Sequence, residues 1–164
     1  MALFTLVHVV ISLIGIITGL VVVGGLLSGK RLDGWTGLFL LTTIVTKLTG
    51  YGFPVDRVLP SHIVGAISLV ALAIACVARY GYHLAGGWRR TYVITAVVSL
   101  YLNVFVLIVQ TFAKVPALRE LAPTQSEPSF AISQLIVLAM FVVLGYRAVV
   151  SFRELPAAPV RQYL

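Results

Sequence analysis

Two histidines are the side chains of this sequence best suited to binding or redox chemistry. His8 lies in the first long apolar run, and His62 lies at the start of the third. A neutral imidazole can exchange a hydrogen bond with a quinone carbonyl or a lipid headgroup, and it can also bind a haem iron. At helical spacing each histidine lies on the small-residue face of its segment, and both map to the same end of the fold. We therefore expect them to face a common site, with haem b and quinone as alternative cofactors.

Other polar residues inside apolar segments extend this candidate site. Lys47 is costly to bury in hydrocarbon, and such residues are functional candidates by default. It lies about two turns from the end of its segment, so snorkelling to the interface or pairing with Asp56 are alternative roles. Buried amides need partners, which directs the polar stripe that includes Asn103 toward protein. The predicted ligand-binding residues are His8, Thr46, Lys47, His62, Asn103, Gln110 and Gln134.

The sequence gives little support for catalysis. No Asp or Glu lies within any of the five apolar segments, and no nucleophile and base stand at a recognisable spacing. The single cysteine, Cys76, has no intramolecular disulfide partner and is expected to pack as a small apolar residue. We predict no catalytic residues, and a metal only if His8 and His62 bind haem.

Five long apolar segments must position these residues, at about 3–28, 34–53, 61–80, 91–113 and 129–150. About 20 apolar residues in a helix cross a bilayer core. The chain of 164 residues is 60% apolar and 10% charged, whereas soluble domains are roughly 45–50% apolar and 25% charged. The sequence therefore predicts an all-α protein. Residues 1–150 form one domain, a five-transmembrane-helix bundle, and residues 151–164 form a short cytoplasmic tail.

Basic residues decide the predicted orientation. The formal net charge is +7, but the basic residues lie in short loops, where an excess of Lys and Arg marks the cytoplasmic side. No nucleic-acid partner is expected. One side holds eight of them: Lys30, Arg31, Arg79, Arg89, Arg90, Arg147, Arg153 and Arg161. The other side holds three: Arg57, Lys114 and Arg119. The N-terminus is therefore predicted outside and the C-terminus in the cytoplasm.

Small residues predict how the helices associate. Gly15 and Gly19 form a GxxxG pattern, and Gly25 and Gly29 repeat it. Such patterns let helices approach closely in lipid. The third segment also carries a small-residue face, so we expect the first and third helices to pack together and bring the two histidines face to face. The same glycines could join copies of the chain in a homo-oligomer or attach it to a larger membrane complex.

Several stretches resemble an uncharacterised family of small integral membrane proteins of proteobacteria. They are Gly29-Lys-Arg-Leu-Asp-Gly-Trp-Thr36, Thr49-Gly50 with Phe53-Pro54, Asp56-Arg57 with Leu59-Pro-Ser-His62, Tyr101-Leu-Asn-Val-Phe105 and Ala122-Pro-Thr-Gln-Ser-Glu-Pro128. The resemblance covers most of the chain. It implies a multi-pass protein of the bacterial inner membrane, and it transfers no chemistry to any residue.

Polar residues gather in the outer half of the predicted bundle, which suggests a cavity open toward the outside. We therefore predict a non-enzymatic binding protein or accessory subunit whose cavity holds a quinone, a lipid or another small amphipathic molecule. One alternative is an electron-transfer subunit with His8 and His62 as axial ligands of a b-type haem. Another alternative is a small transporter.

Overall fold

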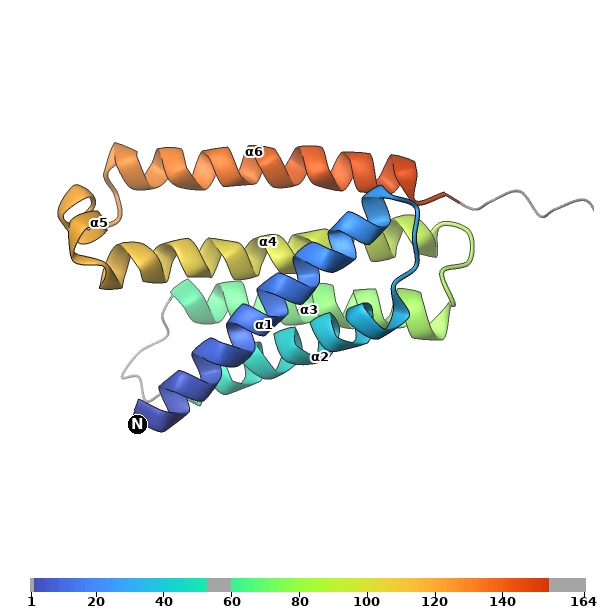
Figure 1. Cartoon of the computed structure of the whole chain (residues 1–164), viewed down its shortest axis with the longest axis horizontal. Helices are drawn as coiled ribbons and strands as arrows, with labels where there is room; N and C mark the ends of the chain where they lie inside the picture. The colour runs from blue at the N-terminus through green and yellow to red at the C-terminus, as the bar shows by residue number, and fades with distance from the viewer. Residues whose placement is uncertain (1, 53–59, 154–164) are drawn as a thin grey trace, which may run out of the picture.

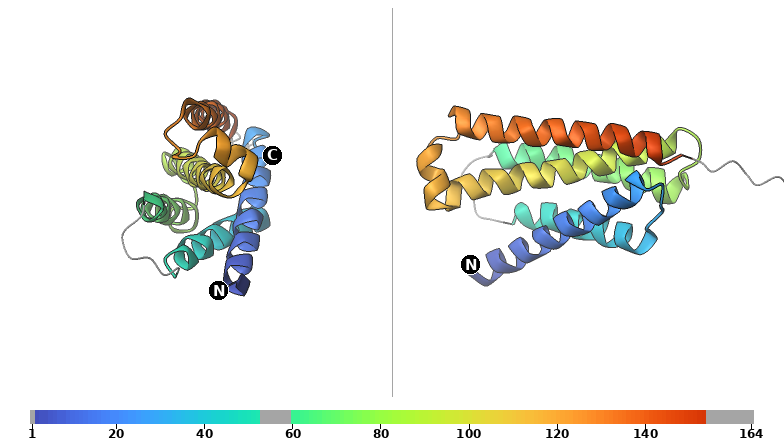
Figure 2. Two further views of the ribbon diagram at one scale, coloured as in Figure 1. Left: turned by 90° about the vertical axis from the view of Figure 1, so that its left-hand side faces the viewer. Right: turned by 45° about the horizontal axis from the view of Figure 1, so that its top comes forward.

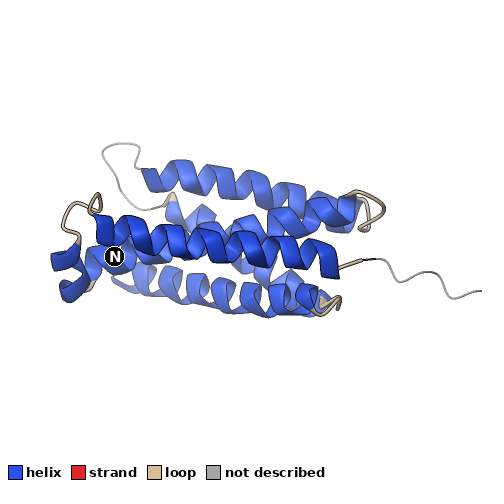
Figure 3. Ribbon diagram, turned by 90° about the horizontal axis from the view of Figure 1, so that it is seen from above, coloured by secondary structure: helices blue, strands red, loops and turns tan. Residues whose placement is uncertain are grey.

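The computed structural model describes residues 2–52 and 60–153, and this part of the chain is helical apart from its connections (Figures 1 and 3). The helices are α1 (Ala2–Leu27), α2 (Asp33–Gly50), α3 (Pro60–Cys76), the π-helical turn η1 (Val77–Gly81), α4 (Trp88–Lys114), α5 (Pro116–Leu121) and α6 (Pro128–Ser151). The all-α prediction is confirmed. The five apolar segments match the long helices to within three residues at each end, when η1 is counted as the continuation of α3. The predicted tail lies mostly outside the described residues.

Four of these helices are long and apolar enough to cross a membrane: Ala2–Leu27, His62–Gly81, Trp88–Lys114 and Pro128–Ser151. Four such helices in one small chain indicate a membrane-embedded protein. The second helix, α2, is not among them, because five threonines, Asp33 and Lys47 dilute its apolar residues. A fifth membrane span therefore stays a prediction.

The helices form a bundle in which α4 is central. It packs against α1, α3 and α6, while α1 packs mainly against α2 (Figure 2). The first helix crosses the bundle obliquely, with its C-terminal end beside α6 and its N-terminal end beside the end of α2 (Figures 1 and 2). At one end of the bundle α1, α3 and α6 begin and α2 and α4 finish, and we call it the cavity end. The opposite end, which holds Arg79, is the Arg79 end.

The glycine face of α1 packs against α2 and α4, so the predicted pairing of the first and third helices is wrong. A Cβ at Gly15 would lie 3.2 Å from the Thr43 hydroxyl, and one at Gly19 would lie 2.6 Å from Leu100 and 2.8 Å from the Phe39 ring. Glycine permits close approach of any helix, and the short connection of residues 28–32 brings α2 alongside first. The second glycine pattern is also filled within the chain, because a Cβ at Gly25 would meet Leu32 at 2.6 Å.

The buried side chain of Arg79 contacts several elements at the Arg79 end. Arg79 lies in η1, its side chain is 2% exposed, and it donates to the carboxylate of Asp33 at the start of α2. Its guanidinium also lies over the ring of Tyr92, 5.2 Å from the centroid, and the Tyr92 hydroxyl donates to Thr36 at 3.4 Å. These contacts join the first turns of α2 and α4 to the end of α3.

The connection between α5 and α6 is held by its own side chains. The Glu127 carboxylate accepts hydrogen bonds from the Thr124 hydroxyl (2.8 Å) and from the backbone N–H groups of Thr124 (3.1 Å) and Ser126 (3.0 Å). Desolvation raises the pKa of this carboxyl, but the hydrogen bonds together lower it more, so the pKa lies below its ordinary value. Gln125 donates to the backbone carbonyl of Val109 at 2.9 Å, which ties the connection to α4.

Candidate functional site

A cavity of about 530 Å³ lies at the cavity end, between α1, α2, α3 and α4. Six of the seven predicted ligand-binding residues line it: His8, Thr46, Lys47, His62, Asn103 and Gln110. They come from four helices, so the fold brings together residues that are up to about a hundred positions apart in the sequence. This co-location makes the cavity the candidate functional site.

The cavity is deep as well as wide. Its lining runs from Thr5 to Ile16 along α1 and from Asn103 to Lys114 along α4. Each stretch advances eleven residues, or about 17 Å at a helical rise of 1.5 Å per residue. The lining therefore extends the same length along both helices, and along α4 this length is more than half of a bilayer core of about 30 Å.

The two histidines line the same cavity and are held by neighbouring residues at the end of α2. Nδ1 of His8 lies 2.8 Å from the hydroxyl oxygen of Thr49. That hydroxyl donates to the Val45 carbonyl at 2.7 Å, so the arrangement favours His8 as the donor to Thr49. His62 stacks on the Tyr51 ring, with centroids 5.4 Å apart, and its carbonyl accepts a hydrogen bond from the Tyr51 hydroxyl at 2.7 Å.

Lys47 is the most unusual group of the site. It is only 7% exposed, yet it lines the cavity. Among residues 2–52 and 60–153 no carboxylate forms an ion pair with it. Its predicted partner, Asp56, lies outside the described residues. A buried ammonium needs an opposite charge or strong acceptors, and the cavity is where a ligand could provide them.

Two residues that line the cavity with Lys47 each carry a buried polar atom. The side-chain nitrogen of Asn103 donates to Thr43 at 3.3 Å, but its oxygen Oδ1 has no hydrogen-bond partner among the described residues. The same holds for the hydroxyl of Thr46. Asn103 is 6% exposed and Thr46 is 8% exposed. A buried polar atom without a partner costs about 1–3 kcal/mol.

The remaining wall is mainly apolar. Val9, Leu13 and Ile16 line it from α1, and Val106 and Leu107 line it from α4. Small-molecule sites typically combine apolar walls with a few placed polar groups. The cavity therefore suits an amphipathic molecule better than a polar metabolite.

Gln134 is the one predicted site residue that does not line the cavity. It is 8% exposed and donates to the backbone carbonyl of Phe105 at 3.3 Å. Its amide thus connects α6 to α4. The helical pattern located its depth along the bundle correctly, but it carried no information about which neighbour its face would meet.

The cavity also includes residues that we did not predict. Tyr51 follows the end of α2, Lys114 lies at the end of α4, and Ser12 lies one turn beyond His8. The Ser12 hydroxyl donates to the His8 carbonyl at 2.7 Å, which is a local bond within α1. The signal for Ser12 and Tyr51 was present in the sequence, because both share a helical face or a chain end with a predicted residue.

No protein-family model, no curated protein and no solved structure matched this chain. The functional argument therefore rests on the fold and on the cavity.

Proposed function

We propose that this chain is a multi-pass membrane protein that binds a small amphipathic molecule with an anionic head. The observation that carries the proposal is Lys47, a buried cation that lines a cavity with mostly apolar walls and has no carboxylate partner among the described residues. An ionised carboxylate or phosphate would pair with the ammonium, and a hydrocarbon tail would lie along the apolar wall.

The polar groups beside Lys47 narrow the chemistry of the head. The Thr46 hydroxyl can donate to an acidic oxygen, and Oδ1 of Asn103 can accept from a hydroxyl or amide N–H. A head that carries an acid together with such a donor would complement the polar side chains of this lining. His8 and His62 lie in the same cavity and add hydrogen-bonding capacity at its sides.

We further propose that all five long helices cross the membrane, with the N-terminus outside and the C-terminus in the cytoplasm. At the Arg79 end the described basic residues are Lys30, Arg31, Arg79, Arg89, Arg90, Arg147 and Arg153, whereas the connections of the cavity end hold Lys114 and Arg119. The positive-inside rule then places the cavity in the outer half of the bilayer. The sequence resemblance favours the bacterial inner membrane.

Photo-crosslinking tests the ligand class. The purified protein in phosphatidylcholine nanodiscs is exposed to a diazirine fatty acid and, separately, to the matching diazirine fatty alcohol, and adducts are located by mass spectrometry. We expect the acid to label the lining stretches of α1 and α4. Lys47→Met should lower labelling by the acid about ten-fold, as expected for the loss of one charge-assisted hydrogen bond, and it should leave labelling by the alcohol unchanged.

The matched control is Lys30→Met, which removes an exposed lysine at the opposite end. It should change neither labelling pattern. Equal labelling by acid and alcohol in the unsubstituted protein would overturn the anionic head. Labelling spread evenly over the lipid-facing surfaces of α1 and α6 would overturn the cavity as the binding site.

A second candidate is electron transfer by a b-type haem, and it is favoured by His8 and His62 lining one cavity. An iron bound by both imidazoles would give a visible absorption spectrum with a strong Soret band. Purified protein expressed with ample haem supply should show that band if the candidate is correct. His8→Ala and His62→Ala should each abolish it. A colourless protein under these conditions excludes this candidate.

A further inference from the structure

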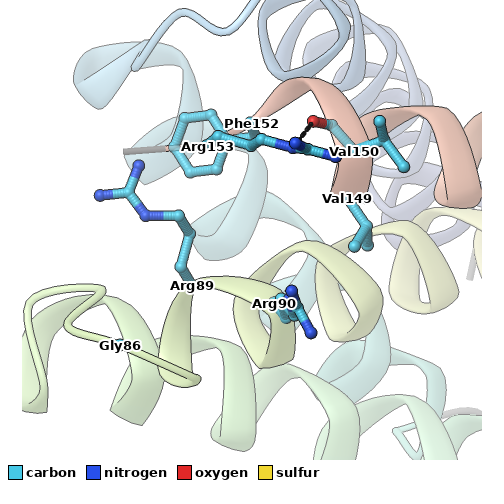
Figure 4. A pocket seen from close by; sticks show the side chains of 7 residues that line it. All are labelled: Gly86, Arg89, Arg90, Val149, Val150, Phe152 and Arg153. Carbon is cyan, nitrogen blue, oxygen red and sulfur yellow. Dashed lines mark hydrogen bonds between the residues drawn. The ribbon is translucent and has the colours of Figure 1, made fainter. Parts of the chain in front are cut away.

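A second cavity lies at the Arg79 end, far from the candidate site. It has a volume of about 370 Å³ and lies between the first turn of α4 and the end of α6 (Figure 4). Three of its seven lining residues are arginines, namely Arg89, Arg90 and Arg153. The other lining residues are glycine, valine and phenylalanine, so no described residue that lines it carries a negative charge.

Two of these guanidinium groups are held in place by contacts with the protein. Arg89 lies over the ring of Phe152, with its guanidinium carbon 5.1 Å from the ring centroid. Nε of Arg153 donates to the Val150 carbonyl at 2.7 Å, near the end of α6. Figure 4 shows Arg89 and Arg90 on the first turn of α4 and Arg153 just beyond the end of α6, and all three line the cavity. A planar guanidinium positioned in this way is suited to binding phosphate oxygens.

The cavity is amphipathic. Val149 and Val150 form an apolar part of its lining. About two turns further along α6, past the exposed Arg147, the surface carries the exposed valines Val142 (63%) and Val143 (56%). Trp88 begins α4 and stacks on Tyr82 with ring centroids 4.0 Å apart. Aromatic residues at the ends of apolar helices are typical of the membrane interface. The arginines therefore lie at headgroup depth, with acyl-chain surface directly beside them.

We propose that this cavity binds the phosphate of an anionic phospholipid. The arginines would contact the phosphate oxygens, and an acyl chain would lie along α4 and α6. Basic pockets between membrane helices on the cytoplasmic side bind such headgroups. This inference rests on the proposed orientation, which puts the Arg79 end on the cytoplasmic side, but not on ligand binding by the other cavity, because the two sites share no lining residue.

Lipid titration followed by native mass spectrometry tests the proposal. The detergent-solubilised chain is titrated with dioleoyl phosphatidylglycerol, with dioleoyl phosphatidylcholine and with inorganic phosphate. We expect one phosphatidylglycerol to bind most tightly and phosphatidylcholine more weakly. The double variant Arg90→Gln/Arg153→Gln should weaken phosphatidylglycerol binding about 30-fold, which is about five-fold for each guanidinium near the membrane surface.

The control is the double variant Lys30→Gln/Arg147→Gln. It removes the same charge from exposed positions at the same end, outside the cavity. It should weaken binding less than about three-fold, since only the general surface potential changes. Equal losses in both double variants would overturn the site in favour of unspecific charge attraction. Competition by inorganic phosphate at equal concentration would overturn the lipid as ligand. The single variants Arg90→Gln and Arg153→Gln, each expected to show about a five-fold loss, keep the test decisive if the double variant does not fold.

Discussion

Each end of the bundle buries a cation, and the two cations differ in whether the described residues give them an ion-pair partner. Arg79 is 2% exposed at its side chain, pairs with Asp33 and lies over Tyr92. Lys47 is 7% exposed and has no ion pair within the described residues. The contacts of Arg79 join neighbouring elements, whereas Lys47 lines a cavity without an ion pair among the described residues. The comparison separates a charge used in packing from the charge on which the proposed ligand binding rests.

The largest expected effect comes from breaking the paired end. Asp33→Asn leaves the buried Arg79 guanidinium without its carboxylate, and an unpaired buried charge costs more than the roughly 1–3 kcal/mol of an unpaired polar group. Because the lost carboxylate is itself 69% exposed, we expect a cost of about 3 kcal/mol. We expect the free energy of unfolding, measured by SDS titration in mixed micelles, to fall by that amount. Arg79→Met should cost less, because the carboxylate that it leaves behind is 69% exposed. An unchanged free energy of unfolding in Asp33→Asn would contradict a stabilising role for the Arg79–Asp33 pair.

The next effect concerns the close packing of α1 against α2 and α4, in the part of the bundle between the two ends. Gly19→Leu places side-chain atoms where Leu100 and the Phe39 ring already lie, at 2.6 and 2.8 Å from the Cβ position. Overpacking typically costs about 1–3 kcal/mol. Gly24→Leu is the matched control on the same helix, since no atom lies within 4 Å of a Cβ there. Equal thermal stability of the two variants in detergent would contradict the packing of α1 described here.

Lys47→Met should change stability in the opposite direction from Asp33→Asn. It removes a buried charge that lacks a described carboxylate partner, and it puts an apolar side chain of similar length in its place. We expect stability in ligand-free detergent to rise by about 1–2 kcal/mol, within the range for burying an uncompensated polar group. A loss of stability of similar size would mean that Lys47 is held by the protein itself, and the contrast with Arg79 would disappear.

The smallest effect is the acid titration of Glu127, a carboxylate of the cavity end. Its pKa lies below the ordinary value, so the bonds to Thr124 and Ser126 are fully present above the unfolded pKa of about 4.3 and are lost as pH falls through the folded value. The protection factors of the Thr124 and Ser126 amides, that is, their exchange rates relative to the unfolded chain at the same pH, should fall over that interval. Glu127→Gln should leave fatty-acid labelling at the Lys47 cavity unchanged, because the hydrogen bonds of this carboxylate come from Thr124 and Ser126 of the same turn.

The sequence could predict the helices and most of the site because both depend on local patterns. Apolar runs set the lengths of α1, α3, α4 and α6, and polar side chains inside such runs must find protein or a cavity. This reasoning placed Lys47, Asn103 and both histidines at one end, where the structure has a single cavity lined by all four.

The missed features depend on tertiary packing. Small residues show that a helix can be approached closely, but they do not say by which neighbour, so the glycine face of α1 was assigned to the wrong partner. Gln134 was likewise assigned to the cavity, but its side chain contacts α4, because a helical pattern does not show which neighbour a polar face will contact. The π-helical turn that contains Arg79 adds one residue per turn without a compositional signal. The short helix α5 follows Pro116 in a connection that reads as a loop.

The polar composition of α2 has a consequence for how the protein is made. A helix with five threonines, Asp33 and Lys47 gains little by entering lipid alone, since charged residues oppose insertion by a translocon. Its partner α1 emerges first, is strongly apolar and lies against it in the finished bundle. Integration of α2 as the second arm of a hairpin with α1 would shield these groups from acyl chains during synthesis. If α2 crosses the membrane as proposed, Lys47, the residue on which the proposed ligand binding rests, also makes insertion of this chain depend on the order in which its helices appear.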